Sequence, residues 1–556
     1  MPEPLQSQFS IALGGESAPA EFMRSLEHVT VETSLHLPDV ATLVLHDPNL
    51  LWIDHAAVMP GVAVRVVAQA GRNEATIFDG EIVEIEPEFA ATQRLTVRAF
   101  DRLHRLARGT HVRSFVNVTD GDVIEQLARE VGLQAQIGPT RQVYPYLLQA
   151  NETNLAFLQR RAALLGYLLY VEHSTLFCVA PEPQRAPLQL AWGDTLYEFR
   201  PRMTTIGQVG RVVARGWDPQ LKQPLFSEAG ASRIAPKTQQ SAQAGGELAD
   251  QVFQIHTELL VADRPIRTQN SADWLAQAAA ERRAGEYIQA EGTCTGLPGL
   301  VAGVPLAVRA VGERFSGTYF VTSAIHRSSA SEGYRTSFTI SGLNPATLLG
   351  LLMPEAETRP ERGLVIGKVT DNNDPEQQGR VKVLFPWFSP EHTSDWARVV
   401  SVGAGKNRGV AWVPEIDDEV LVGFEMGDMH YPYVLGGLWN GVDGAPHAAQ
   451  LVRNGAVQQH VIRSRDGHEI VLRDDAKGGI TIVDKAGNII EFDSDGKTIT
   501  ISTGGDLKLN AGNITFTAQG NIQLNATSQV AVSGQGVVID GGAATVDVTA
   551  TMINLN

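Results

Sequence analysis

The last ninety or so residues of the chain carry apolar side chains in pairs, two positions apart, that recur about every eight residues. Gly, Asn, Ser, Thr or Ala fill the positions between the pairs, and no proline follows Pro446. A spacing of two places both side chains of a pair on one face of a strand, and small polar residues form turns. The pattern therefore predicts an array of short strands. Its apolar pairs are Ile470/Leu472, Ile480/Ile482, Ile490/Phe492, Ile499/Ile501, Leu507/Leu509, Ile514/Phe516, Ile522/Leu524, Val530/Val532, Val537/Ile539, Val546/Val548 and Ile553/Leu555.

Each strand of this array offers two inward apolar side chains, too thin a layer for a core within one ribbon. Either one chain coils into a solenoid, or several chains wind around a common axis. A single-chain β-helix repeats at about 18 to 25 residues, whereas the unit here is about eight residues. We therefore predict three intertwined chains, forming a triple-stranded β-helix over 461–556. The residues predicted to line its axis are Ile499, Ile501, Leu507, Leu509, Ile514, Phe516, Ile522, Leu524, Val530 and Val532.

Residues 1–350 contain β-branched runs separated by polar, Pro or Gly breaks, which predicts a mainly β region with a few helices. The small polar residues of 227–246 predict an exposed loop, and 354–362 a linker. The other expected elements are strands at 29–33, 41–45, 62–67, 95–100 and 167–171, and helices at 120–131, 153–165, 271–284 and 348–353.

Residues 363–441 change character, because short strands with glycine turns follow one another at nearly regular spacing. Five or six strands in about eighty residues is the size of a small closed barrel such as the OB-fold. Residues 442–460 are rich in Gly, Ala and Gln and predict a linker to the repeat array. The expected barrel strands are 365–369, 380–385, 397–400, 409–412, 419–424 and 434–438.

The composition narrows the classes of function. A net charge of −17 without a basic run argues against a nucleic-acid partner, because phosphate binding needs clustered Lys and Arg. The N-terminus lacks the basic and apolar regions of a signal peptide, and there is no apolar stretch of eighteen residues, so we expect a soluble protein at synthesis. Cys178 and Cys294, far apart, predict buried small hydrophobes rather than a disulfide or a zinc site.

Motifs along nearly the whole chain resemble one family. Gln-Gly-Arg-Val-Lys-Val at 378–383, Phe-Pro-Trp at 385–387 and Leu-Gly-Gly-Leu-Trp-Asn-Gly at 435–441 stand in the barrel segment. Asn-Glu-Thr-Asn-Leu at 151–155 precedes them, and Arg-Asp-Gly-His-Glu-Ile at 465–470 follows. In this order the motifs resemble the VgrG-type central spikes of contractile phage tails, type VI secretion systems and extracellular injection particles, with the last branch the most similar.

This resemblance implies a mainly β fold class, with tandem hub β-barrels and a few helices over 1–350, an OB-fold barrel over 363–441 and an intertwined triple-stranded β-helix in a homotrimer. It implies a structural spike that links a sixfold tail tube to a needle, punctures a target membrane and helps to deliver effectors. The implied partners are an Hcp-like tail tube protein at the hub, baseplate proteins, a PAAR-type tip protein, effector cargo and, transiently, the membrane. The protein would assemble in the cytoplasm and then form part of a secreted or cell-associated particle.

The chain ends on a full apolar pair, and no histidine follows His468 to form the iron-binding His-x-His tip of some spikes in the family. An open rod end exposes strand edges and apolar side chains, which need covering. We therefore expect the PAAR-type cone to cap about 545–556. The expected tip contacts are Met552, Ile553, Asn554, Leu555 and Asn556.

The candidate catalytic and metal-binding groups have simpler structural interpretations. The acidic runs at 417–419 and 474–475 fit turns or strand ends, and His468 fits a packing residue at the mouth of the rod. Residues 371–375 lack the ligand spacing of a calcium loop, and 403–406 are not followed by the residues of a phosphate-binding loop. No catalytic residue, cofactor or metal is therefore expected.

One alternative comes from another class of protein, a β-helical tailspike enzyme that cleaves bacterial polysaccharide. Such an enzyme needs a groove lined with carboxylates and aromatic side chains. No aromatic residue follows Phe516, and Asp540 and Asp547 are the only acidic residues in that last stretch. The gap of about twenty residues between barrel and array is also too short for an inserted hydrolase domain.

Overall fold

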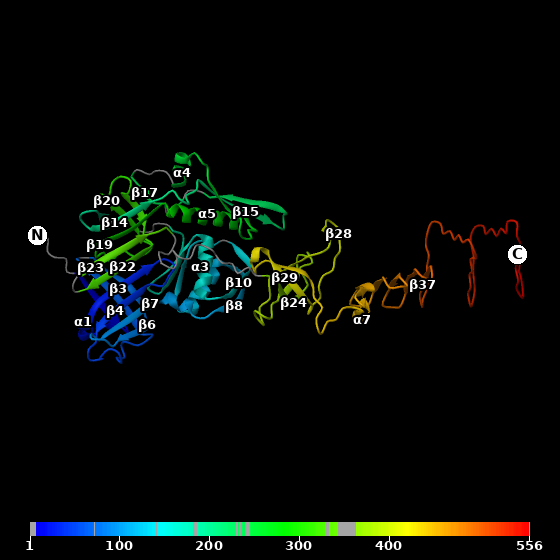
Figure 1. The fold of residues 1–556 in the computed structure, drawn as a ribbon, viewed down its shortest axis with the longest axis horizontal. Coiled ribbons are helices and arrows are strands. Elements are labelled where there is room, and N and C mark those ends of the chain that lie inside the picture. The colour runs from blue at the N-terminus through cyan, green and yellow to red at the C-terminus, as the bar shows by residue number, and fades with distance from the viewer. Residues whose placement is uncertain are drawn as a thin grey trace. The chain divides into compact units, whose positions relative to one another are not determined.

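The computed structural model describes residues 7–71, 73–140, 142–181, 186–229, 232, 235–239, 245–329, 333–342 and 363–554. The chain divides into two compact units, Met1–Asn440 and Gly441–Asn556, coloured blue to yellow and orange to red (Figure 1). The helix expected at 348–353 and the linker expected at 354–362 lie outside the described residues. Within the described ranges, no helix combines the length and the apolar character needed to cross a bilayer.

One large sheet organises the first unit. Its eleven strands run in the order β14-β19-β23-β22-β3-β4-β7-β6-β5-β1-β2, and the strands expected near 29, 41, 62 and 95 are confirmed within it. The strands are β1 (Ser7–Leu13), β2 (Glu16–Ser17), β3 (Leu26–Ser34), β4 (Val40–His46), β5 (Ala63–Ala70), β6 (Asn73–Glu88), β7 (Arg94–Asp101), β14 (Leu196–Met203), β19 (Ile288–Thr295), β22 (Ser323–Ser329) and β23 (Gly333–Ile340), with helix α1 (Ala20–Ser25) beside them.

The two barrels expected in the hub share this single sheet. The antiparallel pair β3–β22 joins strands from residues near 30 to strands from residues near 325. Each half of the sheet packs its own core, one around Leu43, Trp52 and Val97 and the other around Ile288 and Leu306. The boundary between the two predicted barrels is therefore a continuous backbone ladder.

A small α/β layer follows β7, and it contains the first two expected helices. The helix α2 (Asp120–Glu130) is capped by Thr119, whose hydroxyl accepts from the Asp122 amide at 3.2 Å. Asp120, expected as the cap, is instead buried and accepts from Arg161 at 2.5 Å. The other elements are η1 (Arg102–Ala107), β8 (His111–Thr119), β9 (Gln134–Ile137), β10 (Val143–Glu152), α3 (Asn154–Leu165), β11 (Leu168–Glu172) and β12 (Thr175–Val179).

The third expected helix is α5 (Gln269–Gly285), which packs on the three-stranded sheet β16-β15-β18. The loop expected at 227–246 includes the last residues of β16 and the two-residue strand β17, so it is not wholly irregular. The elements of this region are β13 (Leu188–Ala191), β15 (Arg211–Asp218), β16 (Gln223–Glu228), β17 (Lys237–Thr238), α4 (Gly245–Phe253), β18 (Glu258–Val261), β20 (Pro305–Arg309) and β21 (Gly317–Phe320).

A five-stranded barrel sheet in the order β25-β24-β29-β30-β26 forms the last part of unit 1. The strand expected at 409–412 is wrong, because the hairpin ladder ends at the pair Ala404–Gly409 and the residues after it are exposed. The elements are β24 (Val365–Asp371), β25 (Lys382–Leu384), β26 (Arg398–Val399), β27 (Ala404–Gly405), β28 (Arg408–Gly409), β29 (Glu419–Phe424), η2 (Glu425–Gly427) and β30 (Pro432–Gly437).

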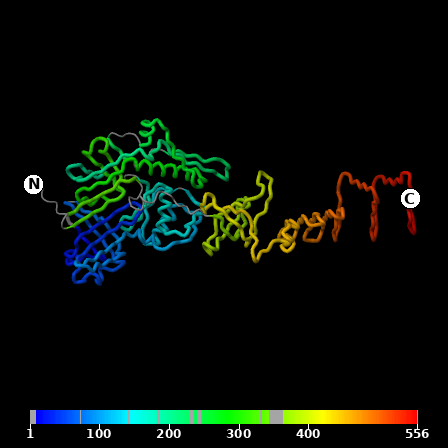
Figure 2. The backbone as a smooth tube through the Cα atoms, viewed as in Figure 1, coloured from blue at the N-terminus to red at the C-terminus, as the bar shows by residue number. Residues whose placement is uncertain are grey.

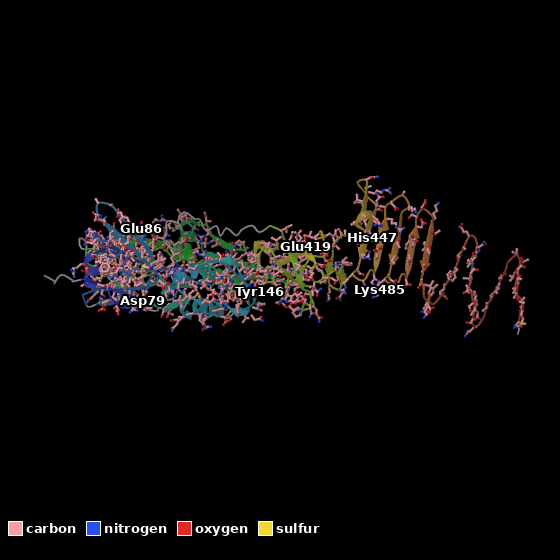
Figure 3. The ribbon with its side chains drawn as sticks, turned by 90° about the horizontal axis from the view of Figure 1, so that it is seen from below. Asp79, Glu86, Tyr146, Glu419, His447 and Lys485 are labelled. Carbon is pink, nitrogen blue, oxygen red and sulfur yellow. The ribbon has the colours of Figure 1, made fainter. Side chains whose placement is uncertain are left out.

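The strand β10 of the hub docks into this barrel. Leu148 is buried among the barrel core residues, and its amide donates to His430 Nε2 at 3.0 Å. His430 Nδ1 lies 2.6 Å from Asp428, and the Tyr146 hydroxyl donates to the carbonyl of Thr393 at 2.7 Å (Figure 3 labels Tyr146). Arg267 also pairs with Glu425. Hub and barrel are thus joined by apolar packing and by buried polar contacts.

Unit 2 begins with structure where the sequence predicted a linker. The helical turn α7 (Ala448–Leu451) leads into the short hairpin β31 (Val452–Arg453) and β32 (Ala456–Val457). Five further strands form one antiparallel meander, in which each strand pairs with the next. They are β33 (Gln459–Arg463), β34 (Glu469–Arg473), β35 (Gly479–Val483), β36 (Ile489–Asp493) and β37 (Thr498–Ser502).

The hub should lose stability in acid through a buried histidine. Burial lowers the pKa of His326, on β22, to about 4, below the value of about 6.5 in the unfolded chain. The neutral form is favoured in the fold, so the stabilisation is complete above pH 6.5 and declines as the pH falls towards 4. We expect His326→Gln to flatten this decline, which amounts to on the order of 3 kcal/mol, in melting temperatures measured across this range.

Asp101 provides the control, because its contribution has the opposite sign. Burial raises the pKa of Asp101 to about 7, so its stabilisation is present in acid and is lost as the pH rises towards 7. Asp101→Asn should therefore steepen the net acid-induced decline that His326→Gln flattens. If both variants shift the pH profile in the same direction, the assignment of the two groups is incorrect.

Candidate interaction surface on the second unit

Aspartate side chains form the turns between the strands of the meander. Asp475 Oδ1 accepts from the amides of Lys477 and Gly478 at 3.1 Å each. Asp484 accepts from Asn488 in the next turn, and hydrogen bonds to that residue lower the pKa of Asp484. These local bonds let short strands reverse direction without contacts from elsewhere. The interpretation of 474–475 as a turn is therefore confirmed.

The register of the meander aligns its apolar pairs into two ladders on one face. Strand pairing places residues of adjacent strands directly opposite each other, so the members of each column are in contact range. One column begins at Ile462 and the other passes through Leu472 and Ile480. We call these columns the apolar face. Its members are Ile462, Ile470, Leu472, Ile480, Ile482, Ile490, Phe492, Ile499 and Ile501.

The opposite face of the same sheet is polar and makes its own contacts. Arg473 donates to Thr481 Oγ1 at 2.8 Å and lies 3.4 Å from a carboxylate oxygen of Glu491. His447 and Arg463 both approach Glu469, at 3.0 and 3.4 Å. Val471 and Thr481 are buried beneath these side chains. One face of the sheet is therefore satisfied within the chain.

The apolar face has no such cover. The six side chains from Ile470 to Phe492 are each 38–40% exposed, and Ile499 and Ile501 are 68% and 55% exposed. Figure 3 shows the strands side by side, with nothing layered on them in unit 2. A continuous exposed apolar surface of this kind is a candidate site of protein–protein contact. The apolar side chains spaced two apart in the sequence thus form an exposed surface in one chain, and they do not form a core within it.

The remaining axis residues lie beyond the meander. In the described stretch 503–554 no backbone strand ladder forms, and Figure 2 shows an open zigzag there. The predicted side chains are all exposed, from 49% for Ile514 to 70% for Leu524 and Val532. Of the expected tip residues, Met552, Ile553 and Asn554 are described and exposed, whereas Leu555 and Asn556 lie outside the described residues.

At the beginning of the array the strands pair within one chain, and the intertwining of three chains stays a prediction. The five strands from Gln459 to Ser502 pair with strands of the same chain, because their Asp-containing turns are short and local. Sequence reasoning also missed β33, whose residues His460 and Ile462 stand opposite Leu472 and Ile470 in the ladder. A His–Ile dyad lacks the apolar pair signal, although the spacing of two is present.

The candidate chemical groups take structural roles. Asp374, within 371–375, accepts from three backbone amides and from Arg380, and the Arg380 bond is the main cause that lowers its pKa. Burial raises the pKa of the thiols of Cys178 and Cys294 to about 12. Across the described ranges, no cluster of three or more His, Cys, Asp or Glu side chains has metal-binding geometry.

The acidic run at 417–419 and His468 also form ion pairs or hydrogen bonds with residues beside them in the fold. Asp417 pairs with Lys368 at 2.9 Å, and Asp418 accepts from the amide of Glu415 at 2.8 Å. The amide of His468 donates to Ser464 Oγ at 3.1 Å, across the turn before β34. None of these contacts brings a base to a nucleophile, so they serve turns and strand ends.

Comparisons with known proteins match the barrel and the region before it separately. Residues 365–439 match the model of the type VI secretion system/phage-baseplate injector OB domain, which confirms the predicted barrel. The type VI secretion system spike protein VgrG5 of Pseudomonas aeruginosa is 25% identical over 487 residues, which cover 78% of this chain and 56% of that protein. The spike protein VgrG3 of Vibrio cholerae is 26% identical over 383 residues, 62% of this chain and 36% of that protein.

Solved structures show the same fold. A structure of a PdpA–VgrG complex aligns with a TM-score of 0.51 at 10% identity, covering 89% of this chain and 98% of that chain. This similarity shows the fold, and the sequence matches show that the chain is similar to VgrG-type spike proteins over most of its length. The chain spans about half the length of the first curated relative, 56% of it.

The particular family is given by the longest match. Residues 6–330, more than half of the 556-residue chain, match the model of the Alg8 N-terminal domain. The chain therefore belongs to the Alg8 N-terminal domain family.

Two neighbouring residues of β37 give a matched test of the apolar face. Ile501 lies on this face, whereas Thr500 lies on the polar face of the same strand. Because an unpaired carboxylate is costly in an apolar contact, Ile501→Asp should weaken self-association at least about tenfold. Thr500→Asp should leave association unchanged. Sedimentation velocity at several concentrations measures both, and equal effects of the two changes would show that the apolar face is not the contact.

Proposed function

We propose that this protein is the central spike of a contractile injection machine. The proposal is supported by the order of its parts, a hub sheet, an OB barrel and a C-terminal strand array, and by its homology to VgrG-type spikes. The observation that carries it is the apolar face of unit 2, which one chain leaves uncovered. A spike must transmit force along its length, and shared strands supply the stiffness.

Three copies of the chain cover their apolar faces against a common axis. Each copy contributes one face with two ladders, so three faces close a triangular prism around a dry centre. Beyond Ser502, the described residues form no strand ladder within the chain, so as strands they would need a neighbour above and below. Three intertwined chains supply both neighbours at every step, which a flat sandwich of two sheets does not. A fully buried aliphatic side chain contributes roughly 1.5–3 kcal/mol, so the summed stabilisation is large.

The other partners follow from the spike role. The hub meets an Hcp-like tail tube, with baseplate proteins around it. If the hub of each chain holds two similar barrels, as in the family that the sequence resembles, three chains present the six positions that a sixfold tube requires. A PAAR-type cone caps the exposed residues around Met552–Asn554 and the chain end. Sheath contraction drives this needle through the target membrane with its effector cargo.

The role is mechanical rather than enzymatic. The acidic pairs and histidines that sequence analysis singled out serve turns and ion pairs. The strand array after Phe516 carries two acidic residues and no aromatic residue, which does not fit the polysaccharide groove of a tailspike enzyme. Incubation with bacterial surface glycans should therefore release no reducing sugar.

The oligomeric state tests the proposal directly. One chain has a mass of 60.0 kDa, so a trimer has three times that mass, 180 kDa. Sedimentation equilibrium of the purified full chain should give the trimer mass over a wide concentration range. The trimer should resist SDS without boiling, because no chain can peel away alone. A folded monomer of 60.0 kDa at high concentration contradicts the spike, and a dimer contradicts the triangular prism.

A further inference from the structure

The OB barrel carries a projecting hairpin whose two strands pair only with each other among the described strands. Residues 401–413, which we call the arm, contain β27 and β28, and the Ser401 hydroxyl donates to the carbonyls of Gly403 and Val410 to close their base. Val402 is 94% exposed, and Val410 and Trp412 are more than half exposed. The arm projects from the barrel in Figure 1 near the label β28. Its apolar side chains therefore face solvent in a single copy.

The same barrel has a second exposed apolar surface on different strands. Leu364 directly precedes β24, Ile366 lies on β24 and Leu435 lies on β30, and all three side chains are exposed. Between them, Gly423 of β29 leaves a shallow floor, because a Cβ atom there would lie 3.3 Å from Leu364 and 3.7 Å from Leu435. We call the three side chains Leu364, Ile366 and Leu435 the strip.

Symmetry connects these two surfaces. In a ring of identical subunits, each copy contacts the next copy through one patch and the preceding copy through a different patch. The ring closes when the rotation between neighbouring copies is a whole fraction of a turn. A twofold dimer would need one self-complementary patch instead. The barrel offers two unlike apolar patches, the arm and the strip, and both remain exposed within one unit. This is the pattern of a barrel built to contact a following copy and a preceding copy.

The charges at the ends of the two surfaces are complementary. Lys406 and Arg408 at the tip of the arm make no ion pair within the described part of the chain. Glu419 stands opposite Lys368 in the strand ladder, at the end of β24 beyond Ile366, and Asp417 pairs with Lys368 there. An arm laid along the strip thus brings cations towards carboxylates, which fixes its direction.

We propose that the arm of one copy clasps the strip of the next copy, so that the three barrels form a closed collar. This inference rests on the proposed trimer. The meander begins at Gln459, 19 residues after Asn440 (459 − 440), a reach of at most about 65 Å. Joining the second units of three chains therefore holds their barrels at high effective concentration. At this effective concentration, a weak apolar contact between arm and strip is sufficient to hold the three barrels together.

Photo-cross-linking of the purified full chain tests the clasp. A benzophenone amino acid is placed at Val402, with a control probe at Ile206, which is 88% exposed in the hub, and a third probe at Ile482 on the apolar face. We expect the Val402 probe to yield covalent dimers and trimers, with the linked peptide mapping to β24 or β30. Adding Ile366→Lys should lower that yield about tenfold, since it places a second cation beside Lys368 and under the cationic tip of the arm. Ile206→Lys should not change it.

The outcomes separate the clasp from the trimer. Links from Val402 within its own chain, or to another part of a second chain, overturn the clasp when the Ile482 probe still yields trimers. The proposed spike then stands without it. If neither Val402 nor Ile482 yields linked chains, both the clasp and the proposed function are wrong. Insensitivity of the Val402 link to Ile366→Lys also overturns the clasp.

Discussion

The constraint on which the rest of the structure depends is the backbone and apolar surface that a single chain leaves unsatisfied. In unit 2, one face of the meander is apolar and exposed, while the other is covered by its own polar side chains. After Ser502, the strand pairs continue in sequence but find no ladder within the chain. Water can hydrate such groups, but apolar dyads repeated over fifty residues gain stability only when they are buried. This is the physical basis of the proposal that the chain works as an assembly of several copies.

The first unit complements this arrangement by being complete in itself. Its large sheet and α/β layer have closed cores, and the barrel shares a core with β10 through Leu148. His430 reinforces that seam, since its Nε2 accepts from the Leu148 amide while its Nδ1 faces Asp428. Burial opposes the charge of Asp428, but the His430 contacts outweigh burial and keep the pKa of this carboxyl low. A rigid junction between hub and barrel suits a part that transmits axial force.

Local patterns were enough to predict much of the fold from the sequence. The helices near 120, 153 and 271 follow from apolar periodicity, and the barrel follows from the spacing of short strands. Three features could not be predicted from the sequence. The β3–β22 ladder joins strands almost three hundred residues apart, which no local pattern specifies. The cap of α2 is Thr119 because Asp120 is drawn into a buried pair with Arg161. The strand expected at 409–412 has β-forming residues but no neighbouring ladder.

The sequence predicted which side chains form the apolar face, but it did not predict how the strands that carry them pair. The dyads name the side chains of the apolar face, yet they do not distinguish strands that pair within one chain from strands that pair between chains. The turns decide this point, because Asp475 and Asp484 close tight reversals. Beyond Ser502, the spacers between the dyads are mostly Gly, Asn, Ser, Thr and Ala, although Asp540 forms a turn of this kind by accepting from the Gly542 amide at 2.8 Å. The described chain thus changes at Ser502 from self-paired strands to dyads without a ladder.

Hydrogen–deuterium exchange of the full chain tests this account most directly. Amides of 503–554 have no strand ladder within the chain, so any protection must come from other copies. The account predicts protection across Leu507, Ile514, Ile522 and Val530 that matches the protection of β34 and β35. Fast exchange throughout this stretch, at concentrations where the protein is folded, would contradict the claim that sister chains cover the apolar dyads.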